Sequence, residues 1–284
     1  MKISNSMDQF LSVHDPEIRN KPFAAYELAV KLTKESLSYA VFDTFQNSIS
    51  ACGIFPRSVI EYLQGNSNDT SSEYWILRQS YGKVIMLIDD EVYTLIPEVL
   101  FQKEKAKHYL KFSHIFDENE MTCIDFIAAS AAYNIYRVPA ETAGFAKNVF
   151  AMYGFKHATT AFINSLIQEK PSGCCMHVHF SQNRFYALVV KNVEIKFCNS
   201  FLFKHENDIL YYLLNIVEQL DLKIIDSLTL SGSINEDSSV ARMLKKYFTP
   251  VVFAQIPANL SCFKEIEKIS VHQYYDLFNC FQCA

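Results

Sequence analysis

Three side chains that can bind a transition metal alternate along one short stretch of the chain. Cys175, His177 and His179 occupy every second position of the run CCMHVHF, and side chains at that spacing share one face of a β-strand. Imidazole and thiolate are ligands of zinc, so a metal-dependent enzyme is one hypothesis for this face. In the alternative, Met176 and Val178 face a core while the imidazoles face a polar cleft or solvent. We favour this alternative, because no further ligand from another element can be named.

Two other patterns resemble parts of metal sites. Asp89, Asp90 and Glu91 stand between the apolar runs KVIMLI and VYTLI. We interpret them as a turn, since acidic residues are common in turns. Cys280 and Cys283 form a C-x-x-C pair with no second pair elsewhere in the chain, which supplies half of a zinc site. The scattered cysteines are typical of small buried side chains in a reducing compartment.

Glycine is scarce, and its distribution limits the sites that the chain can build. The sequence has seven glycines, and no two of them share a five-residue window. A loop that wraps a phosphate needs close backbone approach, often at positive φ, and usually contains several glycines. Neither the G-x-x-x-x-G-K-[ST] nor the G-x-G-x-x-G pattern occurs. The sequence therefore predicts no standard nucleotide loop.

Composition excludes several classes of protein. The chain has 284 residues, is 50% hydrophobic and carries a formal net charge of −5. It is long and apolar enough for two globular domains, and it lacks the basic surplus of a nucleic-acid binder. No apolar run approaches the roughly 18 residues that indicate a membrane span, and the first residues lack the apolar core of a signal peptide. We expect a cytoplasmic protein that does not insert into a membrane.

The predicted elements occur twice in the same order. Residues 26–32, 37–43 and 49–55 read as a three-stranded meander, and residues 176–180, 184–191 and 193–201 read as a second one. Each meander is followed by a helix, a strand, a helix, a strand and a helix. We expect an N-terminal arm at 1–25, a first domain at 26–157 and a second domain at 158–284.

This order resembles the actin-like ATPase fold, in which two ribonuclease-H-like domains face each other across a cleft. The chain is also similar, over most of its length, to an uncharacterised bacterial family of unknown function to which that fold has been assigned. The segments that carry this likeness are LSYAVFDTFQNS, YTLIPEVLF, YNIYRVP, NSFLF with DILYYLL, and LTLSGSINEDS. The resemblance implies an α/β protein with two tandem ribonuclease-H-like domains, whose mixed sheets are flanked by helices.

In nucleotide-binding proteins of this fold, the resemblance implies an Asp-x-Gly turn after the first strand of each domain. Here the two turns are residues 33–36 (TKES) and 181–184 (SQNR), and both lack Asp and Gly. Ser231, Gly232 and Ser233 come close to the expected adenosine turn, with serine in place of one glycine. Lys34 and Arg184 could contact an anion from the two facing turns, but we favour the interpretation that they are ordinary exposed turn residues. Because phosphoryl transfer relies on positioned cations and donors, we expect no catalytic ATP hydrolysis.

The hypothesis that follows is a non-catalytic binding or scaffold protein on a degenerate actin-like fold. By fold-level analogy, its cleft or sheet edges would hold a protein segment or small ligand, as actin-like platform proteins of bacterial secretion and pilus systems do. One alternative is an atypical ATP-binding protein or slow ATPase that uses Mg-ATP at Lys34, Arg184 and the Gly232 turn. The other is the metal-dependent enzyme at Cys175, His177 and His179.

Overall fold

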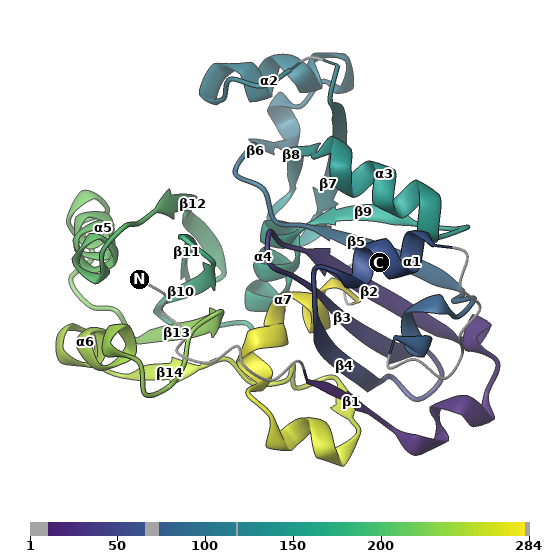
Figure 1. Cartoon of the computed structure of the whole chain (residues 1–284). Helices are drawn as coiled ribbons and strands as arrows, with labels where there is room; N and C mark the ends of the chain where they lie inside the picture. The colour runs from purple at the N-terminus through teal and green to yellow at the C-terminus, as the bar shows by residue number, and fades with distance from the viewer. Residues whose placement is uncertain (1–10, 66–73, 118, 282–284) are drawn as a thin grey trace.

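The computed structural model describes residues 11–65, 74–117 and 119–281. Within these ranges the strands form three sheets (Figure 1). Seven strands make the first sheet, five make the second, and three make a small sheet at the top of the view. The α/β class predicted from the sequence is confirmed.

The first sheet is built on the first predicted meander. Across the sheet the strands are β1 (Ser12–His14), β4 (Ser48–Pro56), β3 (Ser36–Asp43), β2 (Tyr26–Leu32), β5 (Lys83–Ile88) and β9 (Gly154–His157). β2, β3 and β4 are antiparallel, whereas β5 runs parallel to β2 and β9 parallel to β5. Helices α1 (Val59–Gln64) and α3 (Ala140–Val149) pack against one face of this sheet. β3 is buried at every position, so the sheet is covered on both faces.

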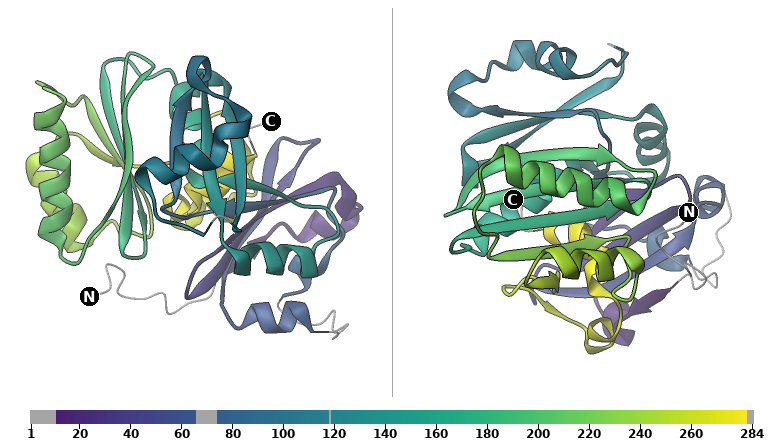
Figure 2. Two further views of the ribbon diagram at one scale, coloured as in Figure 1. Left: turned by 90° about the horizontal axis from the view of Figure 1, so that it is seen from above. Right: turned by 90° about the vertical axis from the view of Figure 1, so that its left-hand side faces the viewer.

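The second sheet repeats this plan with the second meander. Its order is β12 (Glu194–Leu202), β11 (Arg184–Lys191), β10 (Cys174–Ser181), β13 (Ser227–Gly232) and β14 (Val251–Phe253). Helices α5 (Glu206–Gln219) and α6 (Ser239–Tyr247) cover its outer face (Figure 2). In both sheets the first strand of the meander pairs in parallel with the strand that follows the meander. The repeated order predicted from the sequence is therefore present in the topology.

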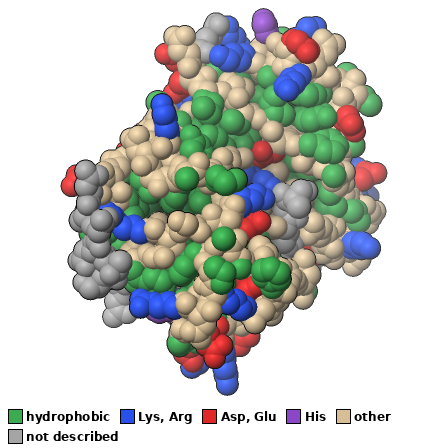
Figure 3. Space-filling model, turned by 90° about the vertical axis from the view of Figure 1, so that its right-hand side faces the viewer, with side chains coloured by type: hydrophobic (Ala, Val, Ile, Leu, Met, Phe, Trp, Pro, Cys, Tyr) green, Lys and Arg blue, Asp and Glu red, His purple; other side chains and the backbone are tan. Residues whose placement is uncertain are grey.

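A small domain-like insertion, which we call the lobe, separates β5 from α3. It consists of the sheet β6 (Tyr93–Pro97), β8 (Ala132–Val138) and β7 (Met121–Ile127), together with α2 (Ala106–Ser113). The apolar segments 122–130 and 133–138 predict two of these strands, and Pro97, which suits the first position of a helix, predicts a helix to about Lys111. The structure has two short 3-10 turns there, and α2 begins nine residues later, at Ala106. Figure 3 shows hydrophobic side chains near the top of the molecule, at the level of the lobe. Two hydrophobic residues of this insertion, Val99 and Phe112, have exposed fractions of 90% and 89%.

Two helices lie between the large sheets and share one core with both. α4 (Ala158–Gln168) leads from the first sheet to the second, and α7 (Tyr275–Cys280) packs against it. The core around them contains side chains of both sheets, including Ala29 of β2 and Leu188 of β11. No helix of the described ranges is long and apolar enough to cross a bilayer. The two sheets are thus joined by a buried helical layer.

A segment near each end of the described chain pairs with the first sheet. β1, in the segment expected as an arm, pairs with β4, and Ile18 is buried; residues 1–10 lie outside the described ranges. β15 (Ser261–Cys262) pairs with β4 as well, although it follows β14 of the second sheet in the sequence. The division at 157/158 stays a prediction, with the qualification that the last segment contributes a strand to the first sheet.

Candidate functional site

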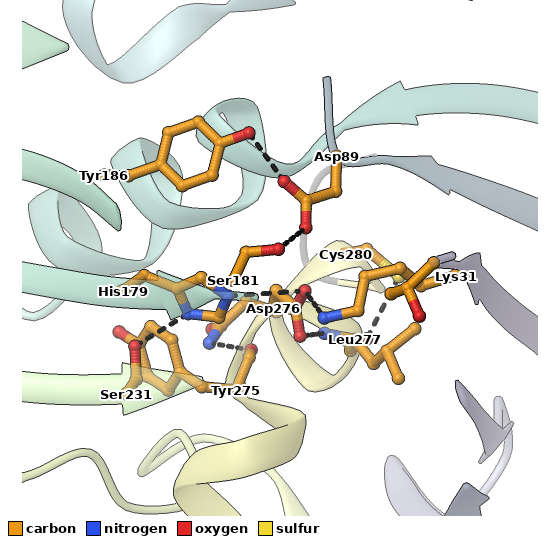
Figure 4. Close-up of polar contacts among 12 residues, drawn as sticks. Lys31, Asp89, His179, Ser181, Tyr186, Ser231, Tyr275, Asp276, Leu277 and Cys280 are labelled. Atoms are coloured by element: carbon orange, nitrogen blue, oxygen red, sulfur yellow. Dashed lines mark hydrogen bonds and ion pairs between the residues drawn. The ribbon is translucent and has the colours of Figure 1, made fainter. Parts of the chain in front are cut away.

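A group of polar side chains lies at the junction of the two large sheets, where α7 passes between them (Figure 4). β2 contributes Lys31, β10 contributes His179 and α7 contributes Asp276. All three are buried, with 7%, 1% and 0% of their surface exposed. Buried charges need partners, and here the partners come from elements far apart in the sequence. We call this group the junction site.

Lys31 and Asp276 form a buried ion pair at the centre of the junction site. Lys31 points inward because side chains alternate along β2: Val30 packs toward α1 and α3, while Ala29 packs toward α4 and α7. Asp276 Oδ1 also accepts a hydrogen bond of 3.0 Å from the backbone N–H of Leu277. The pair therefore ties the first sheet to the C-terminal helix.

A serine between two histidines continues the junction site into the second sheet. Ser231 Oγ lies 2.7 Å from His177 Nε2 and 2.8 Å from His179 Nδ1. A hydroxyl has one hydrogen, so it donates to one imidazole and accepts from the other. Burial lowers the pKa of His177 to about 3 and that of His179 to about 4. Both rings are therefore neutral near pH 7.

The gap between His179 and Asp276 is too wide for a hydrogen bond. His179 Nε2 lies 3.6 Å from Asp276 Oδ2, beyond the usual limit for such a bond. Because the imidazole is neutral and the ammonium of Lys31 contacts the same oxygen, Asp276 is paired with the lysine and not with the histidine. Burial is the main cause of the lowered pKa of His179, and the charge of Asp276 offsets it in part.

The acidic turn after β5 forms a second set of contacts between the sheets. Asp89 accepts hydrogen bonds from Tyr186 Oη (2.6 Å) and from Ser181 Oγ. Burial raises its pKa, but the charge of Lys31 and these bonds lower it more, so Asp89 stays ionised. Asp90 instead pairs with Arg137 of β8 at 2.7 Å. The predicted turn is present, and its carboxylates bind protein groups.

The residues predicted to contact a nucleotide are only partly brought together. Lys34 is exposed in the turn after β2, whereas Arg184 is half-buried and lies 3.4 Å from Glu91. Ser231 is buried between the two imidazoles. Ser233 donates its backbone N–H to Phe180 O at 2.8 Å, which fixes the turn against β10. A nucleotide role for these residues stays a prediction.

Gly232 has a structural reason to be glycine. Its φ is +79°, and a Cβ there would lie 2.1 Å from the carbonyl oxygen of Phe180. A side chain would therefore collide with the neighbouring strand and would also be strained by the backbone conformation. This close packing accounts for the glycine without a ligand.

The predicted metal face is also directed into the junction. Met176 and Val178 pack in the core under α5 and α6, as the favoured interpretation has it. His177 and His179 face inward and are bound to Ser231, while Cys175 is half-buried, with Sγ 3.9 Å from Ser172 O. In the ranges 11–65, 74–117 and 119–281, no three His, Cys, Asp or Glu side chains are grouped as metal ligands. Cys283, half of the C-x-x-C pair, lies outside these ranges.

Ser231, His179 and Asp276 have the residue types of an acyl-transfer triad, but their environment differs from that of a nucleophile. Ser231 is fully buried, its hydroxyl is shared by two imidazoles, and the carboxylate is paired with Lys31. A nucleophile must reach its substrate, and its base must be free to take the proton. The contacts instead connect β2, β10, β13 and α7.

Comparison with known proteins places the chain in a family. The model of a family described as "Protein of unknown function (DUF3822)" matches residues 15–251. The chain belongs to the DUF3822 family. A search of curated proteins finds no match.

Solved structures show the fold of this DUF3822 member. A Bacteroides thetaiotaomicron VPI-5482 protein with an actin-like ATPase fold and unknown function aligns with a TM-score of 0.73 and 18% identity, over 92% of this chain and 97% of that one. A chain of the PilM-PilN type IV pilus biogenesis complex aligns with a TM-score of 0.65 and 6% identity, over 91% of this chain and 98% of that one. The predicted actin-like ATPase fold is confirmed.

The two charged residues at the centre of the junction of this DUF3822 chain, Lys31 and Asp276, belong to no motif that predicts a site. Lys31 follows an apolar run in a strand and stands three residues before Lys34, the lysine of the turn. Asp276 is the acid in the apolar run YYDLFNC. A charge inside an apolar strand or helix is the available signal, because such a residue is rarely buried without a partner.

Proposed function

We propose that this DUF3822 protein is a non-catalytic binding protein that keeps the actin-like frame and does not use ATP. The observation that supports this is the buried pair of Lys31 and Asp276, which occupies the junction of the two sheets together with His179. Phosphoryl transfer needs carboxylates that hold Mg²⁺ and donors directed at phosphates. Here Asp276 is bound by Lys31, and Asp89 by Ser181 and Tyr186.

The ligand in this proposal is a segment of another protein, bound in the cytoplasm. The fold resembles that of a chain in the PilM-PilN complex, which is an assembly of proteins. That likeness concerns the fold alone, so it supports the class of ligand by analogy. A protein that binds a peptide segment needs an accessible groove or strand edge, and it does not need a nucleotide cleft.

Calorimetric titration of Mg-ATP and Mg-ADP into the metal-free protein tests the proposal. We expect no heat of binding at millimolar nucleotide. Micromolar binding that weakens in Lys34→Ala or Arg184→Ala would overturn the proposal in favour of an atypical nucleotide-binding protein. Lys196→Ala is the control, because this lysine and its partner Glu194 are both exposed. Elemental analysis that finds stoichiometric zinc would instead support the metal hypothesis.

A further inference from the structure

A pocket of about 350 Å³ lies between the lobe and one edge of the second sheet. Glu91 and His114 border it from the lobe, Arg184 from β11 and Tyr212 from α5, and residues 199–202 of β12 complete it. We call it the edge pocket. It is separate from the junction site, whose members do not line it.

The edge pocket runs along a strand whose outer side is unpaired in the described part of the chain. β12 is the last strand of the second sheet, next to the lobe in Figure 1. Successive side chains of a strand point to opposite faces, so a pocket lined by four consecutive residues of β12 borders its edge. An edge strand presents unpaired N–H and C=O groups that can pair with an added strand.

Arg184 gives this edge a specific charge. Its side chain is 18% exposed, and Nη2 lies 3.4 Å from Glu91 Oε2. Its other terminal nitrogen, Nη1, is buried, and Tyr186 contributes a side-chain hydrogen bond to the guanidinium, so a ligand would meet the side of the group that faces Glu91. A guanidinium has five N–H donors in a planar fork that matches a carboxylate. Glu91 is 49% exposed, so its side chain can turn to solvent when another carboxylate arrives.

Apolar side chains lie beside this charge. Phe201 of β12 stacks on Tyr212 of α5, with ring centroids 4.6 Å apart and an interplanar angle of 27°. Leu202, which pairs with Arg184 across the two strands, is 55% exposed. The edge pocket thus combines an unpaired strand edge, a cation whose carboxylate partner is a half-exposed glutamate, and apolar side chains.

We propose that the edge pocket binds an extended acidic segment of a partner protein, which adds to β12 as a further strand. A carboxylate of the segment pairs with Arg184 on the face that Leu202 shares, and an apolar side chain at the next position of the segment packs against Phe201 on the other face. This inference rests on the proposed function, because it specifies the partner class of the same non-catalytic protein. Backbone pairing supplies the affinity, and Arg184 selects for acid.

Selection of short random peptides displayed on phage, with the full chain as bait, tests the edge pocket. We expect enriched peptides to carry Asp or Glu within an apolar, strand-forming sequence. Synthetic copies should bind about tenfold more weakly to Arg184→Gln, since a hydrogen bond to a charged group contributes that much or more. They should bind Lys196→Gln as tightly as the parent protein, because Lys196 lies on the same strand outside the pocket.

A second variant keeps the test valid if Arg184→Gln unfolds. Leu202→Asp places a negative charge at an exposed position of the same edge, so the fold should persist while acidic peptides lose about tenfold or more in affinity. The proposal is overturned if no peptide is enriched, if the enriched peptides lack acidic residues, or if they bind both variants as tightly as the parent. Peptides that bind elsewhere leave the non-catalytic function intact, whereas nucleotide binding in the calorimetric test removes that function.

Discussion

Replacing Lys31 by methionine removes a buried ammonium group, keeps a side chain of similar length and leaves the carboxylate of Asp276 without its cation. The two side chains are 9% and 0% exposed, so water cannot replace the lost partner. Breaking such a buried pair typically costs about 3–5 kcal/mol. The free energy of unfolding of a typical domain is about 5–15 kcal/mol, so this single change should remove a large part of it.

Urea unfolding of four proteins measures the coupling between the two charges: the parent, Lys31→Met, Asp276→Asn and the double variant. Each single variant leaves one buried charge unpaired, whereas the double variant leaves none. We expect the double variant to be more stable than either single variant, because neutral replacements of a buried pair are often tolerated. The coupling energy from this cycle should exceed about 2 kcal/mol.

An exposed ion pair in the same C-terminal segment provides the control. Lys268 and Glu265 are 2.7 Å apart, but their side chains are 62% and 49% exposed. Lys268→Met should lower the free energy of unfolding by roughly 0.2–1 kcal/mol. If Lys31→Met costs no more than Lys268→Met, then burial does not strengthen the junction pair, and the physical basis of the junction site is refuted.

Three further predictions concern the same region. Gly232→Ala should lower the free energy of unfolding by about 2 kcal/mol or more. As a control, Gly144→Ala in α3, where a Cβ meets nothing within 4 Å, should raise the free energy of unfolding by roughly 0.5–1 kcal/mol. Equal melting temperatures of the two variants would contradict the packing argument. The pKa values of about 3 for His177 and about 4 for His179 lie below the value of about 6.5 in the unfolded chain. The contribution of the two neutral imidazoles to the free energy of unfolding is therefore complete above pH 6.5. It falls as the pH drops toward 4, by up to about 3 kcal/mol for His179. Urea unfolding at several pH values should show a shallower fall for His179→Gln than for the parent protein. Tyr186→Phe removes a 2.6 Å bond to the carboxylate of the turn after β5 and should cost about 1.5–3 kcal/mol in thermal or urea unfolding, whereas an unchanged curve would show that water replaces the hydroxyl.

The large sheets could be predicted from sequence because their signals are local. β2, β3 and β4, and later β10, β11 and β12, are short apolar runs separated by polar turns. The two faces of β10 were also predictable, since the period of two puts Met176 and Val178 on one face and His177 and His179 on the other. The local sequence pattern predicts the structure correctly where a strand and its neighbours in sequence determine which residues form the strand and which face is buried.

Contacts between distant segments were not predictable in this way. Lys31 and Asp276 are 245 residues apart, and nothing in either local sequence names the other. Two strands of the lobe, β7 and β8, were predicted as strands, but periodicity does not say which sheet a strand joins. β15 is two residues long, too short for any periodic signal.

Because β15 lies late in the sequence, the first sheet cannot be completed until most of the chain has been synthesised. β4 is complete at Pro56, but the strand that pairs beside β1 along its edge is supplied by Ser261 and Cys262. At a synthesis rate of roughly 5–20 residues per second, that strand appears about 10–40 seconds later. During this time part of the β4 edge remains open on the ribosome, as does the face of the first sheet that α7 later covers. The first sheet begins to form early and is among the last parts of the molecule to be completed.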